Sequence, residues 1–217
     1  MLRRRRAASR RAASPVRRSN VQRSAEMQTR ILRATIDCLI AYGYAELTTT
    51  MVAERADVSR GAFLHHFRTK EDLVLAAVEH LFTVRQAQFR AAFARIPADA
   101  DRVSAALDIL WDIVGGDTFY AWIELAVAGR TDDRLGRRVR ELGSRTALVV
   151  ENIFRELFPP PATPNPFFDS APRFVFALLE GLALDRLLVT EPRVEAKQIL
   201  TLIKRLAIFA IPPGGQP

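Results

Sequence analysis

The sequence predicts an all-α protein, and three observations support this fold class. Apolar residues recur at helical spacing in one segment after another, and no segment shows the alternation expected of a half-buried strand. Capping residues, glycines and prolines separate these segments. Hydrophobic residues make up 49% of the 217 residues, which is enough for a substantial core and too many for a disordered chain.

Positive charge is concentrated at the N-terminus. The chain has 32 basic and 24 acidic residues, and eight of its arginines fall within residues 1–20, which contain no acid, so the remainder is neutral. Residues 1–24 are low in complexity and poor in apolar groups, and we expect a disordered Arg-rich tail. Such a tail either contacts DNA phosphates without sequence preference or is a solvated extension, including one produced by a start codon assigned too early.

The single cysteine, Cys38, excludes an internal disulfide and a cysteine-based zinc site. It lies on the apolar stripe of a helix predicted over residues 21–42 and ended by Gly43, which favours core packing over a reactive thiol. No apolar run reaches the roughly 18 residues of a membrane span, and no secretory signal follows the arginines. We therefore expect a soluble, intracellular protein.

Two short helices follow, over residues 49–56 and 60–67. Thr48 and Ser59 suit the N-cap positions that precede them. The link Asp57-Val58 combines a residue that tolerates a left-handed turn with an apolar plug. Two helices joined this tightly predict a helix-turn-helix.

A long helix is predicted from Lys70 to Phe93. Thr69 and Asp72 form a pair resembling a capping box at its start. The cation of Lys70 opposes the helix dipole in the first turn. This position is explained either by ordinary tolerance at a surface or by an external anion that Lys70 faces.

Helix-breaking residues divide the rest of the chain into five more helices. Gly115-Gly116 and Gly129 separate the first three, and Pro159-Pro160-Pro161 ends the third. Pro192 suits the first turn of the last helix. The predicted helices cover residues 99–114, 117–129, 132–158, 170–189 and 192–210.

The last two predicted helices are apolar on nearly every side. Such a helix needs burial on two sides, and one small domain supplies only one. A second subunit across a two-fold axis would cover the other side, whereas the alternative is a monomer with two central helices. We expect a homodimer whose interface contains Phe174, Leu178, Leu184, Leu188, Ile203 and Leu206.

Several short motifs resemble the DNA-binding head of TetR-family bacterial transcription regulators. They are Gly43-Tyr44, Thr48-Thr49-Thr50, Val52–Ala56, Val58–Phe63, His66-Phe67 and Thr69–Leu73. The resemblance covers residues 26–82 in detail and the remaining chain in plan. It implies a three-helix head with a helix-turn-helix at residues 25–82, after the tail at 1–24, and a helical ligand-binding and dimerisation domain at 83–217.

The resemblance also assigns roles to individual residues. It implies that the helix starting at Arg60 enters the major groove and that Arg60 and Gly61 read bases. It implies phosphate contacts for His66, for Lys70 and for the threonines before the recognition helix. The complete set expected to bind DNA is Thr48, Thr49, Thr50, Ser59, Arg60, Gly61, Ala62, Leu64, His65, His66 and Lys70.

Three residues depart from the family pattern. Leu64 replaces the usual tyrosine of the recognition helix, so a phosphate hydrogen bond is lost and Leu64 is expected to pack or to touch a thymine methyl. Asp57 replaces the usual turn glycine and can still adopt a left-handed conformation. Thr49 replaces the usual aliphatic residue after the first capping threonine.

The predicted head has no bulk positive field. Residues 21–80 contain seven basic and eight acidic side chains. Affinity for DNA must therefore come from local placement of Arg60, Lys70, helix N-termini and backbone amides against phosphate.

Aromatic residues are frequent in the middle of the chain. They either pack in the core or line a pocket for a small molecule, for which we expect an apolar or amphipathic effector. The candidates for the pocket are Trp111, Phe119, Trp122 and Phe154.

Catalytic and metal-binding motifs are absent from the sequence. It contains no G-x-S-x-G, P-loop, G-x-G-x-x-G or H-E-x-x-H motif. His65 and His66 are adjacent and point about 100° apart on a helix, which makes a shared metal difficult. We expect no catalytic residue, no metal and no cofactor.

These observations predict a homodimeric, ligand-responsive transcription regulator in the cytoplasm, associated with the nucleoid. We expect a repressor that a small molecule releases from a palindromic operator in double-stranded DNA. The alternatives are a ligand-independent architectural DNA-binding protein and a small enzyme built on the helical core.

Overall fold

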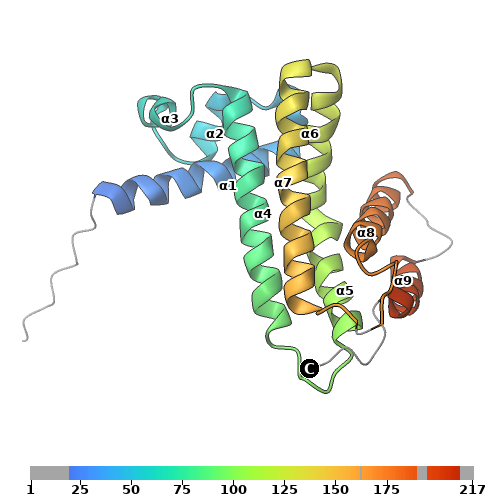
Figure 1. Ribbon diagram of the computed structural model, residues 1–217. Helices are drawn as coiled ribbons and strands as arrows, with labels where there is room; N and C mark the ends of the chain where they lie inside the picture. The colour runs from blue at the N-terminus through green and yellow to red at the C-terminus, as the bar shows by residue number, and fades with distance from the viewer. Residues whose placement is uncertain (1–19, 162, 190–194, 211–217) are drawn as a thin grey trace, which may run out of the picture.

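The computed structural model describes residues 20–161, 163–189 and 195–210, and in these ranges the chain is helical without any strand (Figure 1). This confirms the predicted all-α class. The elements, in chain order, are α1 (Asn20–Glu46), α2 (Thr49–Arg55), α3 (Arg60–His66), α4 (Lys70–Phe93), α5 (Arg102–Ile113), the π-helical turn η1 (Val114–Thr118), α6 (Phe119–Thr131), α7 (Asp133–Leu157), α8 (Ala171–Leu188) and α9 (Ala196–Ala210). None of the helices in the described ranges is long and apolar enough to cross a membrane.

The start of α1 corrects the predicted boundary of the tail. The helix begins at Asn20, so residues 20–24 are helical rather than part of a disordered segment. The prediction for residues 1–19 lies outside the described residues, as does the start of the last helix at Pro192.

Side-chain caps form at the helix starts that the sequence predicts. The hydroxyl of Thr48 accepts from the backbone N–H of residue 51 at 3.2 Å, and the hydroxyl of Ser59 accepts from that of residue 62 at 3.3 Å. The Thr69 hydroxyl accepts from Asp72 at 3.0 Å. Each cap satisfies a backbone donor that the helix leaves free.

The turn between α2 and α3 has the geometry that its sequence suggests. Asp57 adopts φ +51°, and it is the one described non-glycine residue with a positive φ. The next residue, Val58, is half-buried and packs on the core of the head. The turn glycine of the family is therefore replaced here by a residue that takes the same left-handed conformation.

The buried core of the head continues beyond the head. Ile31 and Leu39 of α1, Phe63 of α3 and Leu73 of α4 are at most 1% exposed and belong to one cluster. Leu125 of α6 belongs to the same cluster and is fully buried. The three-helix head and the α6–α7 pair thus share a core, which fixes how α3 is presented.

Cys38 lies in this shared core. The side chain is 1% exposed, and burial raises the pKa of its thiol. The structure therefore confirms the prediction that Cys38 packs in the core.

The glycines around residues 115 and 129 behave differently from each other. Gly116 has φ −132° and ψ −140°, and the predicted break at Gly115-Gly116 takes the form of the π-helical turn η1 between α5 and α6. Gly129, in contrast, does not end its helix, because α6 continues to Thr131. The predicted helix end at Gly129 is wrong.

Gly129 instead allows α6 and α7 to approach closely. A Cβ atom added to Gly136 of α7 would lie 2.3 Å from the carbonyl oxygen of Gly129, and one added to Gly129 would lie 3.1 Å from the Cα of Gly136. These distances leave no room for a side chain at residue 136, because the atom that it would meet belongs to the backbone of Gly129 and cannot rotate away. The two glycines therefore set the separation of α6 and α7.

We predict that Gly136→Ala destabilises the protein by about 1–3 kcal/mol, because the added methyl group forces the two helices apart. The measurement is urea unfolding of the purified protein without DNA. Gly61→Ala is the control: it places the same methyl group in a helix where nothing lies within 4 Å, and the higher helix propensity of alanine should stabilise it by up to about 1 kcal/mol. Equal stability of the two variants would contradict the close approach.

Candidate nucleic-acid interface and ligand cavity

The short helix α3 has one buried and one exposed side. Phe63 and Phe67 are 1% and 6% exposed and anchor the helix to the head. Arg60, Gly61 and His65 are exposed, and Leu64 is 49% exposed. Figure 1 shows α3 at the outer edge of the head, away from α8 and α9. The face that the sequence assigns to base reading is thus open to a partner.

Small residues keep the surface near the start of α3 accessible. A Cβ atom on Gly61 would have no neighbour within 4 Å, so another backbone can approach here closely. Ser59 and Thr48 are exposed, and their hydroxyls accept the capping hydrogen bonds of α3 and α2. The N-termini of α2 and α3 are therefore both exposed at their capping residues. Exposed helix N-termini suit contacts to a phosphate backbone running beside a base-reading helix.

Lys70 has partners within the chain. Its ammonium group donates to the carbonyl oxygen of Ala45 at 3.0 Å and lies 4.5 Å from the ring centre of Tyr44. Partial burial lowers the pKa of Lys70. The carbonyl and the ring explain how a cation is accommodated in the first turn of α4. Its contact with a DNA phosphate stays a prediction, and it requires the ammonium group to leave or share the Ala45 carbonyl.

The end of α1 is also held from α6. Gly43 has φ +70°, and the backbone N–H of the next residue, Tyr44, donates to the Glu124 carboxylate at 2.9 Å. A Cβ atom on Gly43 would lie 2.9 Å from a carboxylate oxygen of Glu124. Glycine is therefore required here both for its conformation and for the approach of Glu124.

Ion pairs connect α7 to the start of α4. Arg138 lies 2.8 Å from the carboxylate of Asp72, and Arg134 lies 3.4 Å from that of Glu71. Hydrogen bonding to Thr69 and to Arg138 lowers the pKa of Asp72. The head is consequently attached to α6 at one point and to α7 at another.

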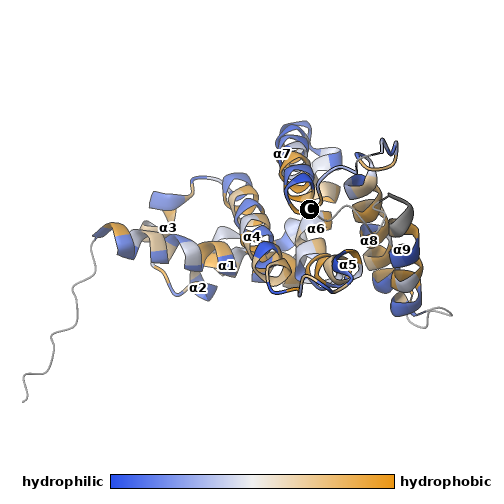
Figure 2. Cartoon of the chain, turned by 60° about the horizontal axis from the view of Figure 1, so that its bottom comes forward, coloured by the Kyte–Doolittle hydropathy of each residue, from blue (hydrophilic) through white to orange (hydrophobic). Residues whose placement is uncertain are grey.

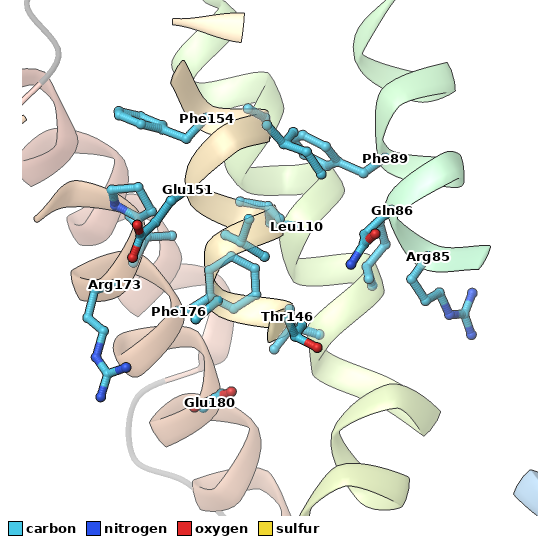
Figure 3. Close-up of a pocket in the computed structure, with 18 of the residues that line it drawn as sticks. Arg85, Gln86, Phe89, Leu110, Thr146, Glu151, Phe154, Arg173, Phe176 and Glu180 are labelled. Atoms are coloured by element: carbon cyan, nitrogen blue, oxygen red, sulfur yellow. The ribbon is translucent and has the colours of Figure 1, made fainter. Parts of the chain in front are cut away.

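A cavity of about 470 Å³ lies among α4, α5, α7 and α8 (Figure 3). Phe119, Trp122 and Phe154 line it, as the sequence predicts, but Trp111 does not. Trp111 belongs to the apolar cluster of α5, α8 and α9. Its ring packs over Gly115, and the Arg186 guanidinium lies 5.5 Å from its ring centre. The assignment of Trp111 to the pocket is therefore corrected.

Sequence reasoning missed other aromatic residues of the cavity. Phe82 and Phe89 of α4, Phe158 after α7 and Phe176 of α8 also line it. A phenylalanine at each of these positions is equally consistent with core packing, so the sequence offered no signal to assign them to a cavity. The aromatic lining indicates a ligand with apolar or aromatic surface.

Four charged residues line the same cavity: Arg85, Glu151, Arg173 and Glu180. Arg85 donates to the Thr118 hydroxyl at 3.1 Å and to a side-chain amide on its own helix, and Figure 3 shows its guanidinium directed away from the rings. Arg173 is exposed.

The two carboxylates of the cavity are less exposed than Arg173. Glu151 and Glu180 are half-buried, and neither forms a hydrogen bond or an ion pair within 4 Å in the described part of the chain. Burial raises the pKa of Glu180, and the charge of Arg173 opposes that rise. The cavity therefore combines aromatic rings with two carboxylates that have no cation in contact.

Helices α8 and α9 carry an exposed apolar face. Leu188 is 71% exposed and Phe174 is 49% exposed. Leu184 and Leu206 are 38% and 41% exposed. In Figure 2, α8 and α9 lie side by side at one end of the molecule, and both carry hydrophobic residues. Ile203 is 3% exposed and packs with α5 and α8 inside the chain, so its assignment to an interface is corrected. Leu178 is half-buried against the same cluster.

No group of histidine, cysteine, aspartate and glutamate side chains suitable for a metal ion occurs in the described residues. His65 and His66 have ring centres 5.7 Å apart in an edge-on arrangement, and His65 is exposed.

Comparison with known proteins defines the class. The family model for bacterial regulatory proteins of the tetR family matches residues 31–77, which run from within α1 to the first third of α4. An HTH-type transcriptional regulator of Mycobacterium tuberculosis, itself uncharacterized, is 31% identical over 182 residues, 84% of this chain and 93% of the relative. The protein is therefore a DNA-binding transcription regulator of the helix-turn-helix type. It belongs to the TetR family.

Two further relatives extend the comparison. The HTH-type transcriptional regulator CymR of Pseudomonas putida is 33% identical over 65% of this chain and 70% of its own length. The structure of the multidrug binding protein EbrR in complex with ethidium matches with a TM-score of 0.59 and 25% identity, over 83% of this chain and 98% of that one. By their names, the first of these proteins is a transcriptional regulator and the second a multidrug binding protein.

Proposed function

We propose that this regulator is a homodimeric, ligand-responsive repressor that binds a palindromic operator in the cytoplasm, at the nucleoid. The single observation that carries the proposal is the pairing of an open recognition face on α3 with an aromatic cavity, both attached to α4. The first turn of α4 follows α3 directly, and Phe82, Arg85 and Phe89 further along α4 line the cavity.

The exposed face of α8 and α9 supports the dimer. Several exposed large apolar side chains on two neighbouring helices are typical of an interface. A two-fold axis beside α8 and α9 would present two α3 helices on one side of the DNA. Two recognition helices of one dimer would then enter major grooves one helical turn apart, about 34–36 Å.

Leu188→Glu should convert the dimer to monomers, because it places a charge in the proposed apolar interface. The measurement is the molar mass by light scattering at a series of protein concentrations. Leu148→Glu is the control, since Leu148 of α7 is 60% exposed and lies outside this face. Dimers that persist in the Leu188 variant would place the interface elsewhere.

Arg60 is the proposed base-reading residue. An arginine with two hydrogen bonds to a guanine contributes roughly 1–3 kcal/mol of discrimination against the wrong base. Thr48, Thr49, Thr50, Ser59, His66 and Lys70 are proposed to contact phosphate, and Gly61, Ala62, Leu64 and His65 to lie against the bases.

Arg60→Ala should relax sequence preference at one position of each half-site, whereas Lys70→Ala should weaken binding to all sequences about equally. The measurement is an unbiased selection of duplexes by the purified protein, followed by affinities for the selected operator and its single-base variants. An unchanged preference in the Arg60 variant would remove Arg60 from base reading. If the wild-type protein selects no sequence, binding by an architectural protein becomes the better explanation.

The effector is proposed to occupy the cavity and to shift α4. A ligand changes operator affinity only if it binds two states of the protein unequally, and couplings of about 1–3 kcal/mol are usual. An effector held between α4, α7 and α8 contacts the helix that begins at Lys70. Movement of α4 there would change the separation of the two recognition helices in a dimer.

The cavity lining supports a lipophilic, aromatic cation as effector. Aromatic faces attract cations, and a cation beside Glu151 and Glu180 would offset the cost of burying their carboxylates. The likeness to a drug-binding protein solved with ethidium agrees with this class of ligand.

Tetraphenylphosphonium should bind and release the operator, whereas tetraphenylborate, of similar shape and opposite charge, should do neither. Glu180→Gln should weaken tetraphenylphosphonium binding about tenfold, which corresponds to about 1.4 kcal/mol. Because burial raises the pKa of Glu180, binding should also weaken as the pH falls through that pKa and the carboxylate is protonated. Calorimetry of the dimer measures these affinities.

Glu141→Gln is the matched control for the effector experiment, because Glu141 of α7 is exposed and does not line the cavity. Preference for the borate would reverse the proposed charge of the ligand. Binding of the phosphonium without release of the operator would keep the ligand class and contradict the proposed response.

A further inference from the structure

The turn between α6 and α7 is rich in arginine. Residues 130–140 contain five arginines and two aspartates. Arg134 and Arg138 are paired with Glu71 and Asp72 of α4. The other three are Arg130, Arg137 and Arg140, which we call the turn arginines; they are exposed and form no ion pair in the ranges that the structure describes.

This arrangement is unfavourable for the isolated chain. α7 begins at Asp133, so Arg134 lies in its first turn, where a positive charge opposes the helix dipole. Arg137 and Arg140 are three residues apart on the same helix, and like charges at this spacing repel. Asp132 caps the helix through its carboxylate and Asp133 offsets one charge. With Arg134 and Arg138 paired to α4, the three turn arginines still exceed these two aspartates by one charge.

The turn lies at the same end of the molecule as the recognition helix. In Figure 1 the α6–α7 turn projects beside the start of α4, level with α3, and it lies between α3 and the α8–α9 pair. The ion pairs of Arg134 and Arg138 fix it against the first turn of α4. The surface of the turn is therefore continuous with the surface around Thr69 and Lys70.

A duplex bound by the proposed dimer has to pass this turn. In the proposed dimer the two-fold axis would lie on the side of α8 and α9, and the second recognition helix would lie beyond that axis. DNA that joins the two helices therefore runs from α3 toward the axis, across the α6–α7 turn. Its two strands present one phosphate charge per about 1.7 Å of helix axis.

We infer that the turn arginines are a second DNA-binding element, which binds phosphates of the operator segment between the two half-sites. The inference rests on the proposed dimer. The guanidinium group suits phosphate because its donors form paired hydrogen bonds to two oxygens. Such interactions position the protein without reading sequence. They supply attraction that the head, with seven basic and eight acidic residues in 21–80, does not provide in bulk.

The test is the salt dependence of operator binding by the full-length dimer. Each arginine that neutralises a phosphate contributes about 0.9 to the slope of log affinity against log salt. Arg130→Gln combined with Arg137→Gln removes four arginines from a dimer and should therefore lower the slope by up to about 3.6. The preferred sequence should not change.

The control removes the same number of charges at the opposite end of the molecule. Arg95 follows α4 and Arg155 lies in the last turn of α7, and both are exposed. Arg95→Gln combined with Arg155→Gln should leave the slope as in the wild type. An equal decrease of the slope in both double variants would mean that net charge alone matters, and it would overturn the inference. An unchanged slope in the turn variant would also overturn it.

Neutral methylphosphonate linkages locate the bound phosphates on the DNA. Placed between the half-sites, they should weaken binding of the wild-type protein and have little further effect on the turn variant. Equal weakening of both proteins would overturn the inference. The same assays test the proposed operator binding separately, through the loss of base discrimination in the Arg60 variant. A failure of the turn arginines to bind phosphate can therefore be distinguished from a failure of the proposed function.

Discussion

The junction where α1 ends is the contact on which the orientation of the head depends. Gly43 has a conformation that favours glycine, and a Cβ atom there would displace the Glu124 carboxylate. Glu124 of α6 then binds the Tyr44 amide, while Lys70 of α4 binds the Ala45 carbonyl. Two consecutive residues of α1, Tyr44 and Ala45, are thus held from two other helices. A change in the relative position of α4 and α6 must strain at least one of these bonds, so the head follows the body of the protein instead of moving freely.

Much of the fold was accessible from the sequence because the signals that define it are local. Thr48, Ser59 and Thr69 act within one helical turn of themselves, and Asp57 carries its turn propensity in its own side chain. The interactions that could not be predicted from the sequence join residues that are far apart along the chain. Gly129 has the same local chemistry whether it ends a helix or faces Gly136, and only the packing of α6 on α7 decides between them.

The candidate sites were predictable to different degrees for the same reason. The recognition face follows from a motif of consecutive residues, and its exposed and buried sides alternate as a short helix requires. The cavity is assembled from several helices, so an aromatic residue on any one of them, such as Trp111, could equally well lie in the core. Ile203 of α9 shows the same ambiguity. When a helix is apolar on nearly every side, its sequence does not reveal which side packs inside its own chain and which side remains exposed. The roles of Glu180 and of the α4 phenylalanines depend on neighbours far away in sequence.

The burial of Cys38 gives the protein an internal reporter. Its thiol lies in the core that the head shares with α6 and α7, and burial both raises its pKa and shields it from reagents. An alkylating reagent can reach the sulfur only in molecules whose head has transiently opened. Since this is the single thiol of the chain, the rate at which the wild-type protein is labelled reports the frequency of that opening, without any engineered probe. Operator or effector molecules that tighten the head would slow the labelling, and those that loosen it would accelerate it.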